Sequence, residues 1–166
     1  MTAADPKPLV RSLLRTEWDA AATNGVTPDI RTGWRLPSDD APVVTISNDE
    51  ESATTETGFA FLGADGPGSR YDGTVQVNAW ATRADVPDAA DTSNPKQLVR
   101  SFRDRVVDVL NDAGPMITTR DDLVVATDAY EYLSVFGSES LEETDPEGGE
   151  VTHRYLIPVG YRTTDR

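Results

Sequence analysis

Residues 73–82, GTVQVNAWAT, give the clearest strand pattern in the chain and decide the predicted fold. Within them, small apolar residues alternate with polar ones and a tryptophan, which is the two-residue period of a β-strand with one face in a core. The apolar set consists of Val75, Val77, Ala79 and Ala81. Trp80 falls on the other face, among polar residues. The sequence therefore predicts a central strand at 73–82 with a core on one side of it.

Amphipathic helices are predicted before and after this strand. From residue 8 to residue 24, apolar side chains recur at spacings of three and four, and Asn24-Gly25 is a typical helix end. The second helix is predicted to begin after Asn94 as N-cap, with Pro95 at its first position, and to end at Gly114-Pro115. Its apolar stripe consists of Leu98, Phe102, Val106, Val109 and Leu110. Each helix therefore has one face for the core.

Shorter extended stretches complete the predicted architecture. Strands are predicted at 29–36, 43–47, 123–136 and 151–161, with a short strand at 59–62 between loops at 49–57 and 66–68. The acidic stretch 137–150 contains five Glu and only Leu141 to bury, so it is predicted to be an exposed, mobile loop. With the short strand at 59–62 left out, the order is α-β-β-β-α-β-β. This order predicts an α+β fold, with two helices packed on one mostly antiparallel sheet, in a single domain over residues 1–166.

The amino-acid composition is typical of proteins that work at high salt concentration. The net charge is -14, from 29 acidic and 15 basic residues, and Lys7 and Lys96 are the only lysines. Such an excess of acid keeps chains soluble in molar salt, where the screening length is about 3 Å, so we expect a halophilic source. No apolar run approaches the roughly 20 residues of a membrane span. The N-terminal sequence does not have the pattern of a secretory signal, and the expected location is the cytoplasm or an assembly built there.

Residue types that carry chemistry are sparse in this sequence. There is no cysteine, and His153 is the only imidazole, without a Gly-x-Ser-x-Gly elbow in the chain. Because it lies mid-strand, His153 is interpreted as a packed or edge histidine. Adjacent carboxylates occur at 39–40, 49–51, 121–122 and 142–143, as expected from so acidic a composition. We therefore expect no catalytic residue, no metal site and no cofactor.

Phosphate and nucleic-acid sites are also not expected. The glycine-rich stretch 63–68 leads into a predicted strand without the Lys and Ser/Thr of a phosphate-binding loop, so it is interpreted as a turn. Arg100, Arg103 and Arg105 cluster on the second predicted helix, but Asp104 and Asp108 lie among them. This pattern is typical of a solvated, salt-bridged helix face. Sequence-specific binding of nucleic acid is not expected.

The aromatic residues are the feature that composition does not explain. Trp80, Tyr130, Tyr132 and Phe136 are more large aromatic side chains than one core face should take. Large aromatics outside a core often mark protein–protein contacts, so these four are the candidate interface. The alternative is that helices or a second sheet layer cover them, and the sequence leaves both interpretations open.

The order of elements and the residue texture resemble a known family. The strand VQVNAWA at 75–81 precedes the helix LVRSFRDRVVDVL at 98–110, and a helix, a strand around Trp34 and PVVTI at 42–46 precede both. Over residues 8–161 the chain resembles the tail-terminator and tail-completion proteins of tailed viruses. The resemblance implies a structural subunit without an active site, in a ring that usually has six copies. Such a ring sits at the head–tail junction of the virion, between the tail tube protein and the neck or connector proteins, and the host would be a haloarchaeon.

Other functions are compatible with the same sequence. The protein could be a different neck component, such as a head-closure or adaptor protein. It could instead be a host regulatory domain that binds another protein. A hydrolase that uses a metal held by the paired carboxylates is a third alternative.

Overall fold

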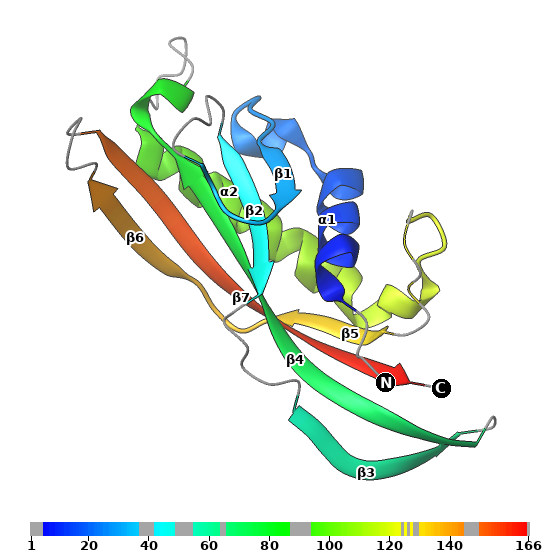
Figure 1. Ribbon diagram of the computed structural model, residues 1–166. Helices are drawn as coiled ribbons and strands as arrows, with labels where there is room; N and C mark the ends of the chain where they lie inside the picture. Colours follow the sequence, from blue (N-terminus) through cyan, green and yellow to red (C-terminus); the bar gives the residue numbers. More distant parts are fainter. Residues whose placement is uncertain are drawn as a thin grey trace.

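The computed structural model describes residues 5–36, 42–48, 55–63, 66–86, 94–123, 125, 127, 130–144 and 150–165 (Figure 1). The elements, in order, are α1 (Pro6–Glu17), the 3-10 helix η1 (Ala20–Thr23), β1 (Asp29–Thr32), β2 (Val43–Asn48), β3 (Thr55–Gly63), β4 (Gly66–Ala81), the 3-10 helix η2 (Arg83–Asp85), α2 (Pro95–Ala113), the 3-10 helix η3 (Gly114–Thr119), β5 (Tyr130–Val135), β6 (Glu139–Thr144) and β7 (Val151–Asp165).

The strands form one seven-stranded sheet of mixed sense. Its main order is β1-β2-β4-β7-β5, with β3 beside β4 and β6 beside β7. The β1–β2 pair is parallel and the other five pairs are antiparallel. The predicted α+β class, with two α-helices and a sheet, is confirmed. The predicted order is wrong in detail, because four strands precede α2 and three follow it.

The first predicted helix is divided in two. Asp5 caps α1 by accepting a hydrogen bond from the Lys7 backbone N–H at 3.0 Å. The chain leaves the helical conformation at Trp18, and Asp19 then caps η1, so α1 ends seven residues before the predicted end. Asn24, in the left-handed conformation, closes the segment as predicted.

The second helix has the predicted boundaries. Asn94 accepts a hydrogen bond from the Lys96 backbone N–H at 2.9 Å, and Pro95 is the first helical residue. Gly114 follows the helix, where a Cβ atom would overlap the carbonyl oxygen of Leu133. The chain then forms η3. Of the strand predicted at 123–136, the structure shows β5 from Tyr130 to Val135.

A single hydrophobic cluster joins both helices to one face of the sheet. In β4 and α2 it contains every apolar residue that the alternation and the helical stripe predict. From α1 it takes Leu9, Val10, Leu13 and Leu14, and from β7 it takes Ile157, Val159 and Tyr161. Trp80 is buried but does not belong to this cluster. The face of the sheet that carries Trp80 is called the outer face below.

Strands β4 and β7 are much longer than their neighbours. They have 16 and 15 residues and pair continuously from Ser69 opposite Asp165 to Ala81 opposite His153. Figure 1 shows that the lower half of β4, with β3 alongside, extends beyond the layer of helices. The turn predicted at 66–68 therefore lies within β4, and residues 55–57 of the predicted loop lie in β3.

Part of the predicted acidic loop is also a strand. Residues 139–144 form β6 and pair with β7, so the prediction of a loop is wrong for them. Every residue from 137 to 144 is exposed except Leu141, so the predicted exposure is confirmed there. The rest of the predicted loop, except Glu150, and most of the loop at 49–57 lie outside the described residues.

Candidate interaction surface

The outer face of the sheet holds a cluster built around a buried arginine. Alternation places Asn78 and Trp80 of β4 on this face, and Arg154 of β7 lies opposite Trp80 in the register. All three are buried, with Asn78 completely inaccessible. Polar residues buried outside an apolar core need partners, and the cluster supplies them.

The Arg154 guanidinium contacts four side chains. Its Nε and Nη2 atoms donate to the Asn78 Oδ1 atom at 3.0 and 2.6 Å, and its Nη1 atom lies 3.4 Å from the Glu143 Oε1 atom. The Cζ atom lies 4.5 Å from the ring centroid of Trp34 and 4.6 Å from that of Trp80. Burial lowers the pKa of Arg154, and Glu143 opposes that shift. The residues Trp34, Asn78, Trp80 and Arg154 are called the arginine–tryptophan cluster.

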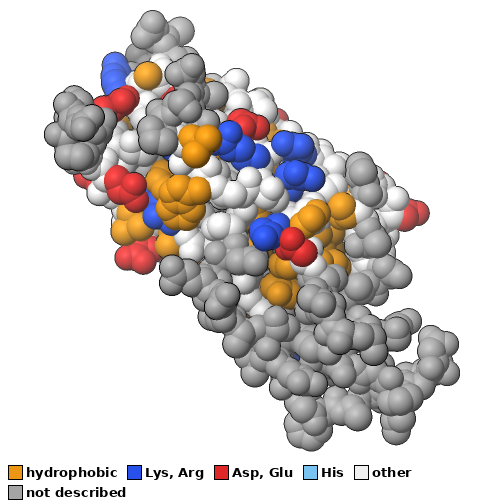
Figure 2. Space-filling view, in the orientation of Figure 1, with side chains coloured by type: hydrophobic (Ala, Val, Ile, Leu, Met, Phe, Trp, Pro, Cys, Tyr) orange, Lys and Arg blue, Asp and Glu red, His pale blue; other side chains and the backbone are white. Residues whose placement is uncertain are grey.

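Trp34 reaches this cluster because β1 and β2 are parallel. The chain that leaves the end of β1 does not turn back beside it, and Figure 1 shows the segment 33–36 crossing in front of the sheet. The Trp34 ring meets the Trp80 ring edge to face at 5.2 Å, and the Trp80 Nε1 atom donates to the Thr45 Oγ1 atom at 3.1 Å. Trp34 itself stays 50% exposed. Figure 2 shows hydrophobic side chains at the surface over β4 and β7.

A second aromatic group lies along β5 on the same face. Tyr132 stacks against Arg162 of β7, whose Cζ atom is 5.3 Å from the tyrosine ring centroid. The Phe136 ring lies directly over Gly160, where a Cβ atom would overlap it, and remains 68% exposed. The outer face thus has aromatic side chains at two places.

The structure separates the four residues predicted as an interface. Phe136 is exposed, Tyr132 is half-buried, and Trp80 is buried beneath Trp34. Tyr130 lies in the core on the opposite face, and its hydroxyl donates to the Asp5 carbonyl oxygen at 2.9 Å. Burial raises the pKa of Tyr130.

Sequence reasoning missed Trp34 and Arg154 as members of this surface. A large aromatic directly after Gly33, at the end of a short strand, was the available signal for Trp34. Nothing in the sequence distinguishes Arg154 from the other arginines, because its role depends on cross-strand register.

His153 of β7 is mostly buried and lies on the face of the sheet opposite the outer face. Its Nδ1 atom is 3.7 Å from the Glu142 Oε1 atom, and Glu142 also pairs with Lys96. Burial lowers the pKa of His153, and the nearby Glu142 carboxylate partly opposes this. Of the two interpretations, a packed or an edge histidine, its burial agrees with the first, since β7 pairs with β4 and β6 on either side of it. Among the described residues, no three His, Asp or Glu side chains are grouped to hold a metal ion.

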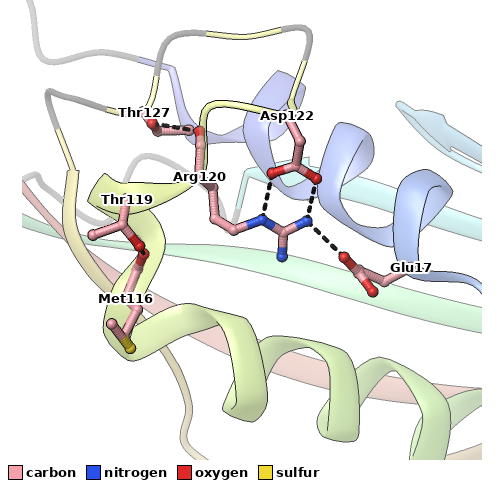
Figure 3. A network of polar contacts seen from close by, with 6 residues as sticks. All are labelled: Glu17, Met116, Thr119, Arg120, Asp122 and Thr127. Atoms are coloured by element: carbon pink, nitrogen blue, oxygen red, sulfur yellow. Dashed lines mark hydrogen bonds and ion pairs between the residues drawn. The ribbon is translucent and has the colours of Figure 1, made fainter.

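A charged cavity of about 720 Å³ lies on the helical side of the molecule, and its lining includes Glu17, Arg105, Asp108 and Met116. Arg120 also lines it. Figure 3 shows this residue held by two hydrogen bonds to Asp122, at 2.6 and 2.7 Å, and by one to Glu17 at 2.6 Å. These bonds raise the pKa of Arg120 and lower that of Asp122. The network ties the end of α1 to the segment after η3.

The arginines predicted to form a solvated helix face have different surroundings. Arg103 pairs with Asp104 at 2.9 Å, as predicted, and its Cζ atom lies 5.1 Å from the Tyr155 ring centroid. Arg105 instead donates to the Glu17 carbonyl oxygen at the end of α1. Arg100 is exposed. Two of the three therefore take part in packing.

No known protein-family model matches the sequence, and no curated protein is significantly similar to it. In the described part of the chain, no helix is both long and apolar enough to span a membrane.

Proposed function

We propose that the protein is a structural subunit that acts by assembly, as a tail-terminator-like ring protein between the tail tube and the head-side neck of a virus. The observation that carries the proposal is the outer face of the sheet. Two of the four large apolar side chains that are exposed in the described structure, Trp34 and Phe136, lie on this face, and Leu36 follows Trp34 by two residues. Exposed aromatic side chains outside a core are common at protein–protein contacts.

The aromatic groups on this face are suited to binding. Trp34 rests on Arg154 and Trp80, and Phe136 rests on Gly160, so both rings are held in place before any partner arrives. Preorganised aromatic side chains lose little conformational entropy on binding and are common at interface centres. A standard interface buries about 800 Å² per partner, which is enough to cover both groups.

The resemblance in order of elements supplies the identity of the partners. These would be other copies of the chain in a ring, most simply of six, with the tail tube protein on one side and neck proteins on the other. The acid-rich composition favours a halophilic host, and for a tailed virus this means a haloarchaeon. Such a subunit acts by burying surface between neighbouring copies in the ring, without a chemical reaction.

Electron microscopy of the virus that encodes the protein tests the proposal. The expected result is one ring of copies at the head–tail junction. Copies that line the capsid, repeat along the tube or are missing from virions would show that the protein is not a tail terminator.

Variants test the role of the outer face in the same particles. Leu36→Asp and Phe136→Asp should give heads and tails that fail to join, while the purified variants keep the circular dichroism of the wild type. Met116→Asp is the matched control, because Met116 is 63% exposed but lies on the helical side. Normal virions from both outer-face variants would contradict the proposal.

A further inference from the structure

Four of the 15 basic residues of this acidic protein lie together at one end of the sheet. Lys7, Arg11 and Arg15 follow one another at four-residue spacing along α1, and Arg31 lies on the adjacent β1. Figure 2 shows Lys and Arg side chains gathered over β1. Like charges at this helical spacing repel each other, and an acid-rich composition does not produce a row of basic residues. These four residues are called the basic edge. Two of them also pair with acids of the same edge, Lys7 with Asp5 and Arg31 with Asp29, both at 3.6 Å.

A positively charged side chain also covers the unpaired edge of β1. Asp29 N–H donates to the Pro42 carbonyl and Gly33 N–H donates to the Ile46 carbonyl, both at 2.9 Å, so the odd-numbered residues of β1 face β2. The Ile30 carbonyl therefore points away from the sheet, and it accepts a hydrogen bond from the Arg15 Nε atom at 2.8 Å. A guanidinium occupies the place where another strand could add, so a partner at this edge meets side chains.

The other side of the sheet is acidic. Strand β6 carries Glu139, Glu142 and Glu143, has no basic residue, and pairs with no described strand other than β7. All three carboxylates are exposed, although Glu142 also contacts Lys96 and Glu143 also contacts Arg154. Figure 2 shows acidic side chains along the side where β6 runs. These three residues are called the acidic edge.

We infer that the basic edge of one copy docks on the acidic edge of the next copy, in a head-to-tail contact. The inference deepens the proposed function, on which it rests, by naming the contact between neighbouring subunits. The two edges have opposite charge, whereas either edge placed against itself would bring like charges together. A twofold dimer through either edge is therefore disfavoured.

The arrangement of the strands lets one subunit use both edges at once. From β1 to β6 the sheet runs through β2, β4 and β7, which at about 4.8 Å per strand separates the edges by roughly 19 Å. A head-to-tail contact of this kind repeats from copy to copy, and it forms a ring when the rotation between copies closes.

Engineered cysteines test this contact directly, because the chain has none of its own. Arg11 and Glu139 are suitable positions, since the first is half-buried and the second exposed. Concentrated Arg11→Cys/Glu139→Cys protein, oxidised in molar salt, should give a ladder of disulfide-linked multimers on non-reducing gels. Each single variant should stay monomeric on the same gel. Arg11→Cys/Asp112→Cys is the matched control, because it moves the second cysteine to an exposed position on α2, and it should give no ladder.

Charge reversal tests whether the same contact depends on these charges. Arg11→Glu and Glu139→Arg should each lower the association constant of the intact chain about tenfold, measured by light scattering, and the combined variant should restore it. Absence of a ladder, a purely monomeric protein, dimers from Glu139→Cys alone, or binding of DNA by the basic edge without a ladder would each overturn the inference. A ring in virions without a ladder would leave the proposed function standing and refute only this contact. A ladder without a ring in virions would support this contact and refute the proposed function.

Discussion

Removal of the Trp34 ring should destabilise the monomer far more than its 50% exposure suggests. The ring covers the guanidinium of Arg154, which is buried, and meets Trp80 edge to face. A cation–π contact to a desolvated arginine contributes about 1–2 kcal/mol, and an edge-to-face aromatic pair adds about 0.5–1.5 kcal/mol. Because half of the ring already faces solvent, little is added for lost burial. Trp34→Ala should therefore lower the free energy of unfolding by about 2–3 kcal/mol.

Urea denaturation at fixed molar salt measures this change as a shift of the midpoint with an unaltered slope. Met116→Ala is the matched control, since Met116 is also largely exposed, at 63%, but has no such partner among the described contacts. Its effect should stay within about 0.5 kcal/mol. Trp34→Phe keeps an aromatic ring, so its loss in free energy of unfolding should lie between those of Trp34→Ala and Met116→Ala.

A double-mutant cycle identifies the source of the loss. Combined with Arg154→Met, Trp34→Ala should cost about 1–2 kcal/mol less than it does alone, because the cation is already gone. If Trp34→Ala costs less than about 0.5 kcal/mol, or if the two changes are additive, then Trp34 does not stabilise the buried arginine and the reasoning is refuted.

Three further outcomes are expected. The melting temperature should fall between 1 M and 0.01 M salt, as the screening length rises from about 3 to 30 Å, and a flat circular dichroism series would contradict the halophilic interpretation. Because burial lowers the pKa of His153, the unfolded state binds the proton more readily, so stability should drop as the pH falls through about 6.5. His153→Gln should reduce this drop in thermal melts, and an unchanged pH profile would argue against it. Gly114→Ala should cost about 1–3 kcal/mol in urea denaturation, because its Cβ would overlap the Leu133 carbonyl oxygen, whereas Gly137→Ala, in open space, should not. Equal effects of the two glycine changes would contradict the described packing.

The parts of the structure that follow from local chemistry could be predicted from the sequence. The alternation around Val77 places the core, and the capping residues Asn94, Pro95 and Gly114 fix the ends of α2. Both depend on neighbours within a few positions along the chain. They describe one strand and one helix well, but they do not say how the strands are arranged.

Residues whose surroundings depend on distant register could not be predicted. Tyr130 and Tyr132 share parity, yet a bulge in β5 places two residues against one of β7, and this turns Tyr130 into the core and Tyr132 outward. Strand β6 has no apolar alternation, because its only partly buried side chain is Leu141 and it is paired through its backbone. Trp34 reaches its cluster through the crossing between two parallel strands, which no local pattern reveals.

The long pairing of β4 with β7 also governs when the molecule can fold during its synthesis. The residues it joins lie about 70 to 100 positions apart, and β7 fills a place between β4 on one side and β5 with β6 on the other. At roughly 5–20 residues per second, the nascent chain carries β4 with one edge unfilled for several seconds before residues 151–165 emerge. During that interval the last strand of a neighbouring nascent copy can fill the same place. Synthesis of many copies on one message therefore favours exchange of β7 between chains, and dimers formed in this way would be products of translation and not of assembly.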